Sequence, residues 1–226
     1  MSVHHEVRPD LISELAGELV AAGPALDELD QRITVAIYRL LAGGDPVPPV
    51  AIAERVGLPV ERVVSALDSW PGVYRDHHGA VTGFWGLALT DMPHRFTIQG
   101  RTLYTWCAWD ALFLPVILDT EAHVQSACAT TGEPVTLTVT PAGVDALSPA
   151  TAVLSFLRPD DRLGADVISS FCHHIVFLSS PTAAQTWTAT HPDTFLLSIQ
   201  EGFDLGRRTW QARLGTALGN GAALRP

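Results

Sequence analysis

The chain has 226 residues and a mass of 24.3 kDa, which is enough for one domain or for two small ones. Hydrophobic residues make up 47% of it and charged residues 17%, a composition that excludes a disordered chain. The formal net charge is −10, and every basic residue is an arginine. This balance argues against a protein that binds nucleic acid through clustered cations, and it tolerates neutral or cationic small substrates.

No apolar run approaches the roughly 20 residues that a membrane-spanning helix needs. The N-terminal segment also lacks a basic-then-apolar signal pattern, so we expect a cytoplasmic protein with no membrane partner. The three cysteines are too few, and odd in number, for a disulfide scaffold. They are either three small buried hydrophobes or part of a soft-metal or nucleophilic site.

The first part of the chain predicts helices followed by a hairpin. In chain order these are helices over residues 1–24, 26–42, 50–56 and 59–69, then strands over 73–76 and 81–89. Pro59 suits the first turn of its helix, and the order is that of a winged helix. Because residues 1–90 carry 6 arginines against 12 acidic residues, we expect no DNA binding. The simplest alternative is that the module packs against the remaining chain and covers part of it; the sequence leaves open whether it is a lid, a packing element or a docking surface.

The second part predicts short strands flanked by helices. The expected strands cover residues 94–98, 101–104, 122–128, 135–140, 152–157 and 175–178, with helical stretches over 106–118, 181–191 and towards the end of 195–218. Pro115 interrupts the first helix, and Thr182 is a candidate N-cap of the second. The predicted fold class is α+β: a winged-helix-like N-terminal module, residues 1–90, followed by a domain of short antiparallel β-sheets flanked by helices, residues 91–226.

Cys107 and Asp110 form a C-x-x-D pair among large apolar residues. If the segment is helical, positions i and i+3 share one face. A carboxyl group in such surroundings has a raised pKa and can hold or donate a proton. The alternative, that Asp110 caps a turn or accepts a backbone N–H, is equally compatible with the spacing.

Cys172 lies 65 residues further on and is followed by His173 and His174, for which a strand start is the simpler interpretation. Two thiols and a carboxylate from separate segments can converge on a soft metal ion. A zinc site of Cys107, Cys128, Cys172 and His173 is possible by ligand type, but it lacks the short ligand spacings of structural zinc sites. Cys128 has no polar neighbours in sequence that would lower the pKa of its thiol, so we interpret it as structural.

Three collinear blocks resemble the organomercurial lyases (alkylmercury lyase, MerB). They cover residues 103–115, 126–139 and 170–177, and all three cysteines fall on cysteine positions of that family. The similarity extends from about residue 26 to about residue 212. The first 25 residues lack a clear match and are expected to be a variable extension. The family implies a winged-helix-like module before an α+β catalytic domain.

The resemblance also implies a role for each motif residue. Cys107 and Cys172 correspond to the two mercury-binding cysteines, Asp110 to the carboxylate that handles the proton, and Cys128 to a structural cysteine. The implied reaction converts R–Hg⁺ and a proton into R–H and Hg(II). It needs no organic cofactor, because the metal belongs to the substrate.

The expected partners are an organomercurial substrate, external small thiols that remove Hg(II), and a mercuric reductase downstream; the protein itself is expected to be a monomer or a weak homodimer. An aromatic wall of Trp106, Trp109 and Phe171 would accept alkyl and aryl groups, although core packing is an equally compatible role for each ring. The alternative function is a non-catalytic thiol protein that binds or senses metals. The carboxyl group of Asp110 argues against this alternative, because sequestration by thiols does not need it.

Overall fold

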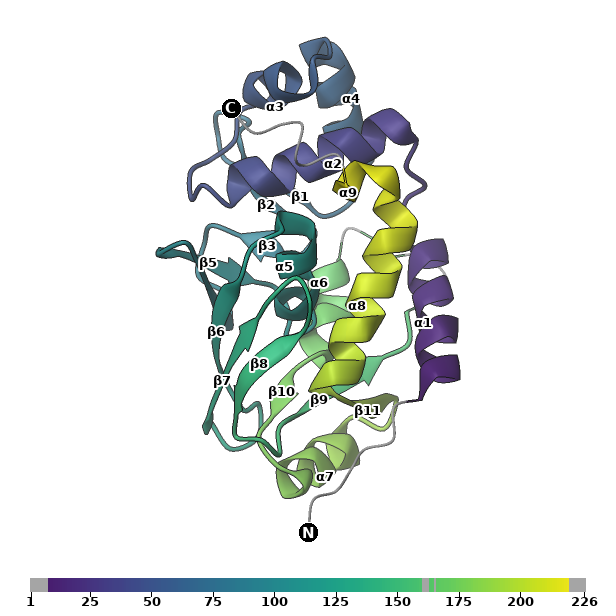
Figure 1. The fold of residues 1–226 in the computed structure, drawn as a ribbon, viewed down its shortest axis with the longest axis vertical. Helices are drawn as coiled ribbons and strands as arrows, with labels where there is room; N and C mark the ends of the chain where they lie inside the picture. Colours follow the sequence, from purple (N-terminus) through teal and green to yellow (C-terminus); the bar gives the residue numbers. More distant parts are fainter. Residues whose placement is uncertain (1–7, 160–162, 165, 220–226) are drawn as a thin grey trace.

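A computed structural model describes residues 8–159, 163–164 and 166–219 (Figure 1). The helices are α1 (Pro9–Ala22), α2 (Glu28–Leu41), α3 (Pro49–Val56), α4 (Val60–Ser69), α5 (Asp110–Leu118), α6 (Val167–Ser170), the 3-10 helix η1 (Cys172–His174), α7 (Pro181–Thr190), α8 (Ile199–Leu214) and α9 (Thr216–Gly219). The strands are β1 (Val73–Arg75), β2 (Val81–Phe84), β3 (Leu87–Ala88), β4 (His94–Ile98), β5 (Arg101–Thr105), β6 (Ala122–Ala127), β7 (Pro134–Val139), β8 (Val144–Ser148), β9 (Val153–Leu157), β10 (Phe177–Leu178) and β11 (Thr194–Ser198). None of the described helices is long and apolar enough to cross a membrane.

The N-terminal module has the predicted winged-helix order of α2, α3 and α4 followed by the β1–β2 hairpin (Figure 1). Asp27 and Asp30 form a capping box that starts α2. Gly57 ends α3 with a φ of 67°, a left-handed conformation that glycine adopts without steric cost. Pro59 is the N-cap residue of α4 and lies just outside its first turn. The predicted α+β class is confirmed.

One sheet runs through both parts of the chain. Its strand order is β1-β2-β3-β5-β4-β6-β7-β8, with antiparallel pairing throughout. The short strand β3 joins the hairpin of the N-terminal module to β5 by pairing Leu87 with Thr105. A second antiparallel sheet has the order β10-β9-β11. The N-terminal module is therefore joined to the rest of the chain by backbone hydrogen bonds as well as by packed side chains.

The helices α5 and α8 lie at the centre of the molecule, and α8 also packs along α1 (Figure 1). Eight of the nine residues of α5 are buried. The helix continues through Pro115, so the predicted interruption is wrong. The missing N–H removes one hydrogen bond, and burial of almost the whole helix offsets that loss. At Gly206 of α8, an added β-carbon would lie 2.6 Å from the β-carbon of Phe113, so glycine permits this close approach.

Several boundaries differ from the predictions. Strands β8 and β11 were not predicted; β8 is mostly exposed and lacks an apolar alternation. Ser180, rather than Thr182, caps α7 by accepting a hydrogen bond from the backbone N–H of Ala183. Residues 172–174 form the 3-10 helix η1 and not the start of a strand. This last difference matters for the site, because it determines where the Cys172 side chain points.

Candidate active site

The Cys107 segment is a tight turn between a strand and a helix. Strand β5 ends at Thr105, whose hydroxyl donates to the carbonyl oxygen of Cys107 at 2.9 Å. The backbone N–H of Cys107 donates to Oδ2 of Asp110 at 2.8 Å. Helix α5 begins only at Asp110, so Cys107 lies before the helix and the expected helical i, i+3 pair is wrong. The two residues still meet, because the carboxylate accepts a backbone N–H in the turn, which is the alternative role considered for Asp110.

Cys172 reaches the same place from a segment far away in sequence. It begins η1, and two hydrogen bonds hold the adjoining chain. The hydroxyl of Ser155 donates to the carbonyl oxygen of His174 at 2.9 Å. The backbone N–H of Ala108 donates to the carbonyl oxygen of Ile175 at 3.1 Å. The second bond ties the segment after Cys172 directly to the turn that carries Cys107. The two cysteine segments are thus positioned against each other by the backbone.

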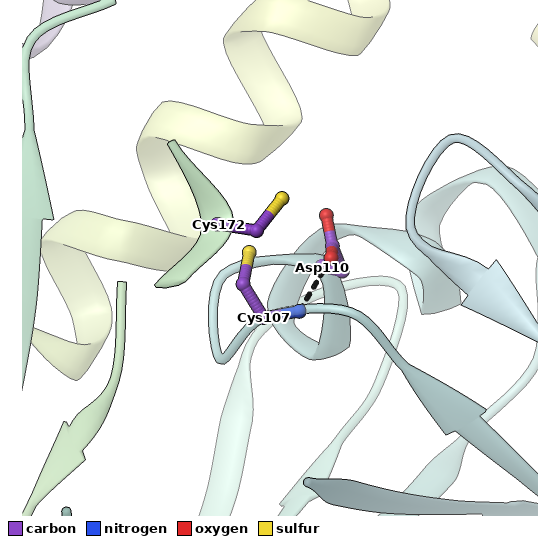
Figure 2. A group of neighbouring side chains, drawn as sticks. All are labelled: Cys107, Asp110 and Cys172. Atoms are coloured by element: carbon purple, nitrogen blue, oxygen red, sulfur yellow. Dashed lines mark hydrogen bonds between the residues drawn. The ribbon is translucent and has the colours of Figure 1, made fainter. Parts of the chain in front are cut away.

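The three predicted residues form one cluster. The two Sγ atoms and a carboxylate oxygen of Asp110 all lie within 4.8 Å of one another. Figure 2 shows the two sulfur atoms beside each other, with the Asp110 carboxylate close to them. Cys107 is 1% exposed, and Asp110 and Cys172 are each 5% exposed. Two soft ligands and one oxygen ligand, all protected from water, form a small site suited to a soft metal ion.

Burial determines the protonation of this cluster. It raises the pKa of Asp110 to about 7, although hydrogen bonds from Cys107 oppose the shift. Burial also raises the pKa of the Cys107 thiol well above its ordinary value, and the hydrogen bond with Cys172 and the charge of Asp110 add to the effect. Near neutral pH the thiol of Cys107 therefore keeps its proton, while the carboxyl group of Asp110 is poised to accept or donate one.

A mostly apolar cavity of about 90 Å³ opens onto the cluster and is lined by Asp110 and Cys172. The three predicted wall residues, Trp106, Trp109 and Phe171, all line it. Sequence reasoning missed the other lining residues, among them Trp85 and Gly86, just before β3, and Trp210 and Arg213 on α8. Their distance in sequence from the cysteines left no signal that could have placed them here.

Gly86 sets the position of the Asp110 carboxyl group. Its φ is +101°, a conformation that side chains rarely adopt. An added β-carbon would lie 2.5 Å from the carboxyl carbon of Asp110, and the carbonyl oxygen of Gly86 accepts the N–H of Trp106 at 3.0 Å. Both the backbone conformation and the close approach therefore require glycine next to the cluster.

Cys128 has a different environment, away from the cluster. Its Sγ accepts the N–H of Ser179 at 3.3 Å and lies 3.4 Å from the hydroxyl of Thr130. Hydrogen bonds from Ser179, Thr130 and Thr131 outweigh burial and lower the pKa of this thiol to about 6. The expectation that no sequence neighbour lowers the pKa of Cys128 is wrong, because Thr130 and Thr131 lower it together with Ser179 from a distant segment.

The zinc site of four ligands is not formed in the described part of the chain. There, neither Cys128 nor His173 joins Cys107, Asp110 and Cys172 in a metal-binding group. The site has two thiols and a carboxyl group, an arrangement with room for a ligand between them. Such a site binds a soft metal ion beside a proton donor.

Comparisons with known proteins agree with a site that binds a soft metal ion beside a proton donor. The chain belongs to the alkylmercury lyase family. The family model for alkylmercury lyase matches residues 87–211, and the model for the helix-turn-helix domain of alkylmercury lyase matches residues 10–85. Whether the boundary lies at residue 90, and whether the first 25 residues vary in the family, stay predictions.

Named relatives cover most of the chain. An alkylmercury lyase of Staphylococcus epidermidis is 44% identical over 171 residues, which are 76% of this chain and 78% of the relative. One of Pseudomonas putida is 37% identical over 196 residues, 87% of this chain and 91% of the relative. The crystal structure of the mercury-bound form of MerB2 has the same fold, with a TM-score of 0.71 and 22% identity, over 88% of this chain and 97% of that one.

Proposed function

We propose that this protein is an organomercurial lyase that cleaves the carbon–mercury bond of R–Hg⁺ by protonolysis, with Cys107, Asp110 and Cys172 as its catalytic residues. The observation that carries the proposal is the cluster itself: two buried thiols and a buried carboxyl group with their ligand atoms within 4.8 Å. Membership of the alkylmercury lyase family supports it independently. The substrate class is therefore small organomercurials.

In the first step Cys107 binds mercury as a thiolate. Its raised pKa means that a proton must leave as the Hg–S bond forms. Asp110 is adjacent, and a carboxyl group with a pKa of about 7 accepts that proton readily near neutral pH. The ligand that accompanied mercury, such as an external thiolate, leaves in exchange.

In the second step Cys172 adds as the second thiolate and releases its own proton to solvent. Two thiolates increase electron density on the mercury-bound carbon, which weakens the Hg–C bond. Asp110 then delivers its proton to that carbon, and R–H leaves. Of the two thiol protons, the one from Cys107 ends on carbon by way of Asp110, and the one from Cys172 goes to solvent, where it balances the charge of the displaced thiolate. Hg(II) remains bound by Cys107 and Cys172, with the Asp110 carboxylate available as an oxygen ligand.

The mercury belongs to the substrate, so the proposed reaction uses no organic cofactor. External small thiols are proposed to remove Hg(II) from the two cysteines by exchange, and a mercuric reductase is proposed to receive it. We further propose that the protein acts in the cytoplasm as a monomer or weak homodimer and binds neither nucleic acid nor membranes. The net charge of −10 supports the last point.

Headspace gas analysis tests this function. Purified protein is incubated with methylmercury and excess small thiol, and methane is measured against protein concentration. Many equivalents of methane per protein are expected. Stoichiometric mercury binding without methane would contradict the proposal and favour the alternative of a non-catalytic thiol protein that binds or senses metals.

A further inference from the structure

Arg213 places a positive charge in the wall of the active-site cavity. It lies near the end of α8 and is largely buried. Its guanidinium lies 5.3 Å from the ring centres of both Trp85 and Trp210 and donates one hydrogen bond, to the carbonyl oxygen of Pro24 at 3.1 Å. It also lies so close to Gly23 that an added β-carbon there would collide with it. The group is therefore held in one place.

No carboxylate in the described residues pairs with this arginine, and its buried Nε has no hydrogen-bond acceptor among them. The arginines that do form ion pairs lie nearer the surface than Arg213; Arg62, which pairs with Asp30, is an example. Burying an unpaired charge is costly. Two aromatic rings and one carbonyl oxygen compensate only part of that cost. An anion in the cavity would provide the missing partner.

The cavity wall relates Arg213 to the reacting atoms. The side chain of Asp110 packs against Gly86. Trp85 directly precedes Gly86 in the chain, and the guanidinium of Arg213 lies over the ring of Trp85. The hydroxyl of Tyr38 donates to the carbonyl oxygen of Trp85 at 2.8 Å, which fixes this part of the cavity wall. Arg213 is thus on the side of the cavity to which Asp110 belongs.

The organic group of the substrate must lie on that same side, because the proposed mechanism has Asp110 protonate its carbon. The organic group extends along Trp85 and Trp210, and its far end approaches Arg213.

We propose that Arg213 is a specificity-determining residue that favours organomercurials whose organic group carries an anionic substituent remote from mercury, such as an aryl carboxylate. The inference rests on the proposed function. Trp85 and Trp210 offer aromatic surface for the aryl ring, and the guanidinium offers a charge-assisted hydrogen bond for the carboxylate. The lining of the cavity is mostly apolar, so the local positive charge acts there more strongly than the distant acidic groups of the chain.

The test compares two arylmercurials that differ only in charge, 4-carboxyphenylmercury and 4-carbamoylphenylmercury. The kcat/KM ratio of the charged to the neutral compound is measured through the released benzoic acid and benzamide. We expect the ratio to exceed one in the wild type and to fall at least about tenfold in Arg213→Gln. Arg213→Lys keeps the charge and should retain part of the ratio. Arg208→Gln, on the exposed face of the same helix, is the matched control and should keep the wild-type ratio.

Both compounds are measured with the same protein sample, so a partial loss of folded protein cancels from the kcat/KM ratio. A wild-type ratio near one, or the same ratio in Arg213→Gln and the wild type, would overturn the inference. If no variant releases an arene from either compound, the proposed function has failed instead. The inference is then tested by binding alone, through quenching of tryptophan fluorescence by the two arylmercurials in the wild type and Arg213→Gln. Equal affinity ratios in that titration would overturn it.

Discussion

Two buried thiol environments in this molecule affect sulfur in opposite ways. At Cys107, apolar burial, a neighbouring thiol and a carboxylate raise the pKa of the thiol. At Cys128, an N–H and several hydroxyls lower the pKa to about 6, although that side chain is also buried. Burial alone therefore does not decide thiol chemistry; the neighbouring donors and charges do. The high-pKa thiol has a base beside it for its proton, whereas the low-pKa thiol is fully occupied by hydrogen bonds within the protein.

The largest expected effect comes from removing the proton carrier at the first site. Asp110→Asn can still accept the N–H of Cys107, so its geometry should be kept, but it cannot carry a proton. Hydrocarbon release from methylmercury should fall by roughly a hundred- to ten-thousandfold, while mercury still binds. Asp119→Asn, at the other end of α5, is the control and should turn over normally. Full turnover by Asp110→Asn would remove Asp110 from the mechanism.

Cys172→Ser tests whether both thiols of the cluster are needed. A hydroxyl is a poor ligand for mercury, so the electron density on carbon should not increase. We expect at least about a hundredfold loss of kcat, in line with the loss of a nucleophilic or metal-binding group. Mercury should still bind once per protein through Cys107, as measured by mass spectrometry under native conditions. An active Cys172→Ser protein would assign the second ligand to another residue.

Gly86→Ala tests the position of Asp110 without changing any group of the cluster. The new methyl group would displace the carboxyl group and strain the backbone at a φ of +101°. We expect kcat to fall by roughly tenfold or more, because small displacements of a reacting group are costly. Gly79→Ala has a similarly positive φ but open space around it, so it is the control for backbone strain. Equal losses in the two variants would mean that strain, and not the contact with Asp110, is responsible.

The raised pKa of Asp110 should also appear in stability. The folded state holds this proton more tightly than the unfolded chain, so its contribution is fully present below about pH 4 and is lost as the pH rises through about 7. At pH 8, Asp110→Asn should be more stable than the wild type by up to about 4 kcal/mol. The difference should shrink towards pH 5. Urea unfolding at several pH values measures it, and a difference independent of pH would contradict the shifted pKa.

At Cys128 we expect the opposite effect on stability, because there a substitution destabilises the folded protein. Cys128→Ser should lower stability by about 1–2 kcal/mol, because a smaller oxygen would fit the donors of Ser179 and Thr130 less well. The kcat value should stay close to that of the wild type. A loss of turnover with an unchanged melting temperature would contradict a structural role for Cys128. The comparison between the two thiol environments would then no longer separate chemistry from stability.

The cluster of Cys107, Asp110 and Cys172 could be predicted because its residues lie in the C-x-x-D motif and in two of the sequence blocks that resemble the alkylmercury lyases. The fold class followed from helical spacing and strand alternation, which depend on local burial. Three features depend on contacts between distant segments and could not be predicted. Pro115 stays helical because α5 is buried, Ser179 lowers the pKa of Cys128 from another strand end, and Arg213 reaches the cavity from α8.

The continuous sheet has a consequence for any attempt to divide the protein. A fragment beginning after residue 90 would lose β3, and the edge of β5 would then present unpaired backbone groups, a template for aggregation. It would also lose Trp85, Gly86 and Tyr38, which lie on or behind the wall of the cavity. The helix-turn-helix portion therefore forms one wall of the active-site cavity. We expect that the two parts can be exchanged between relatives only together.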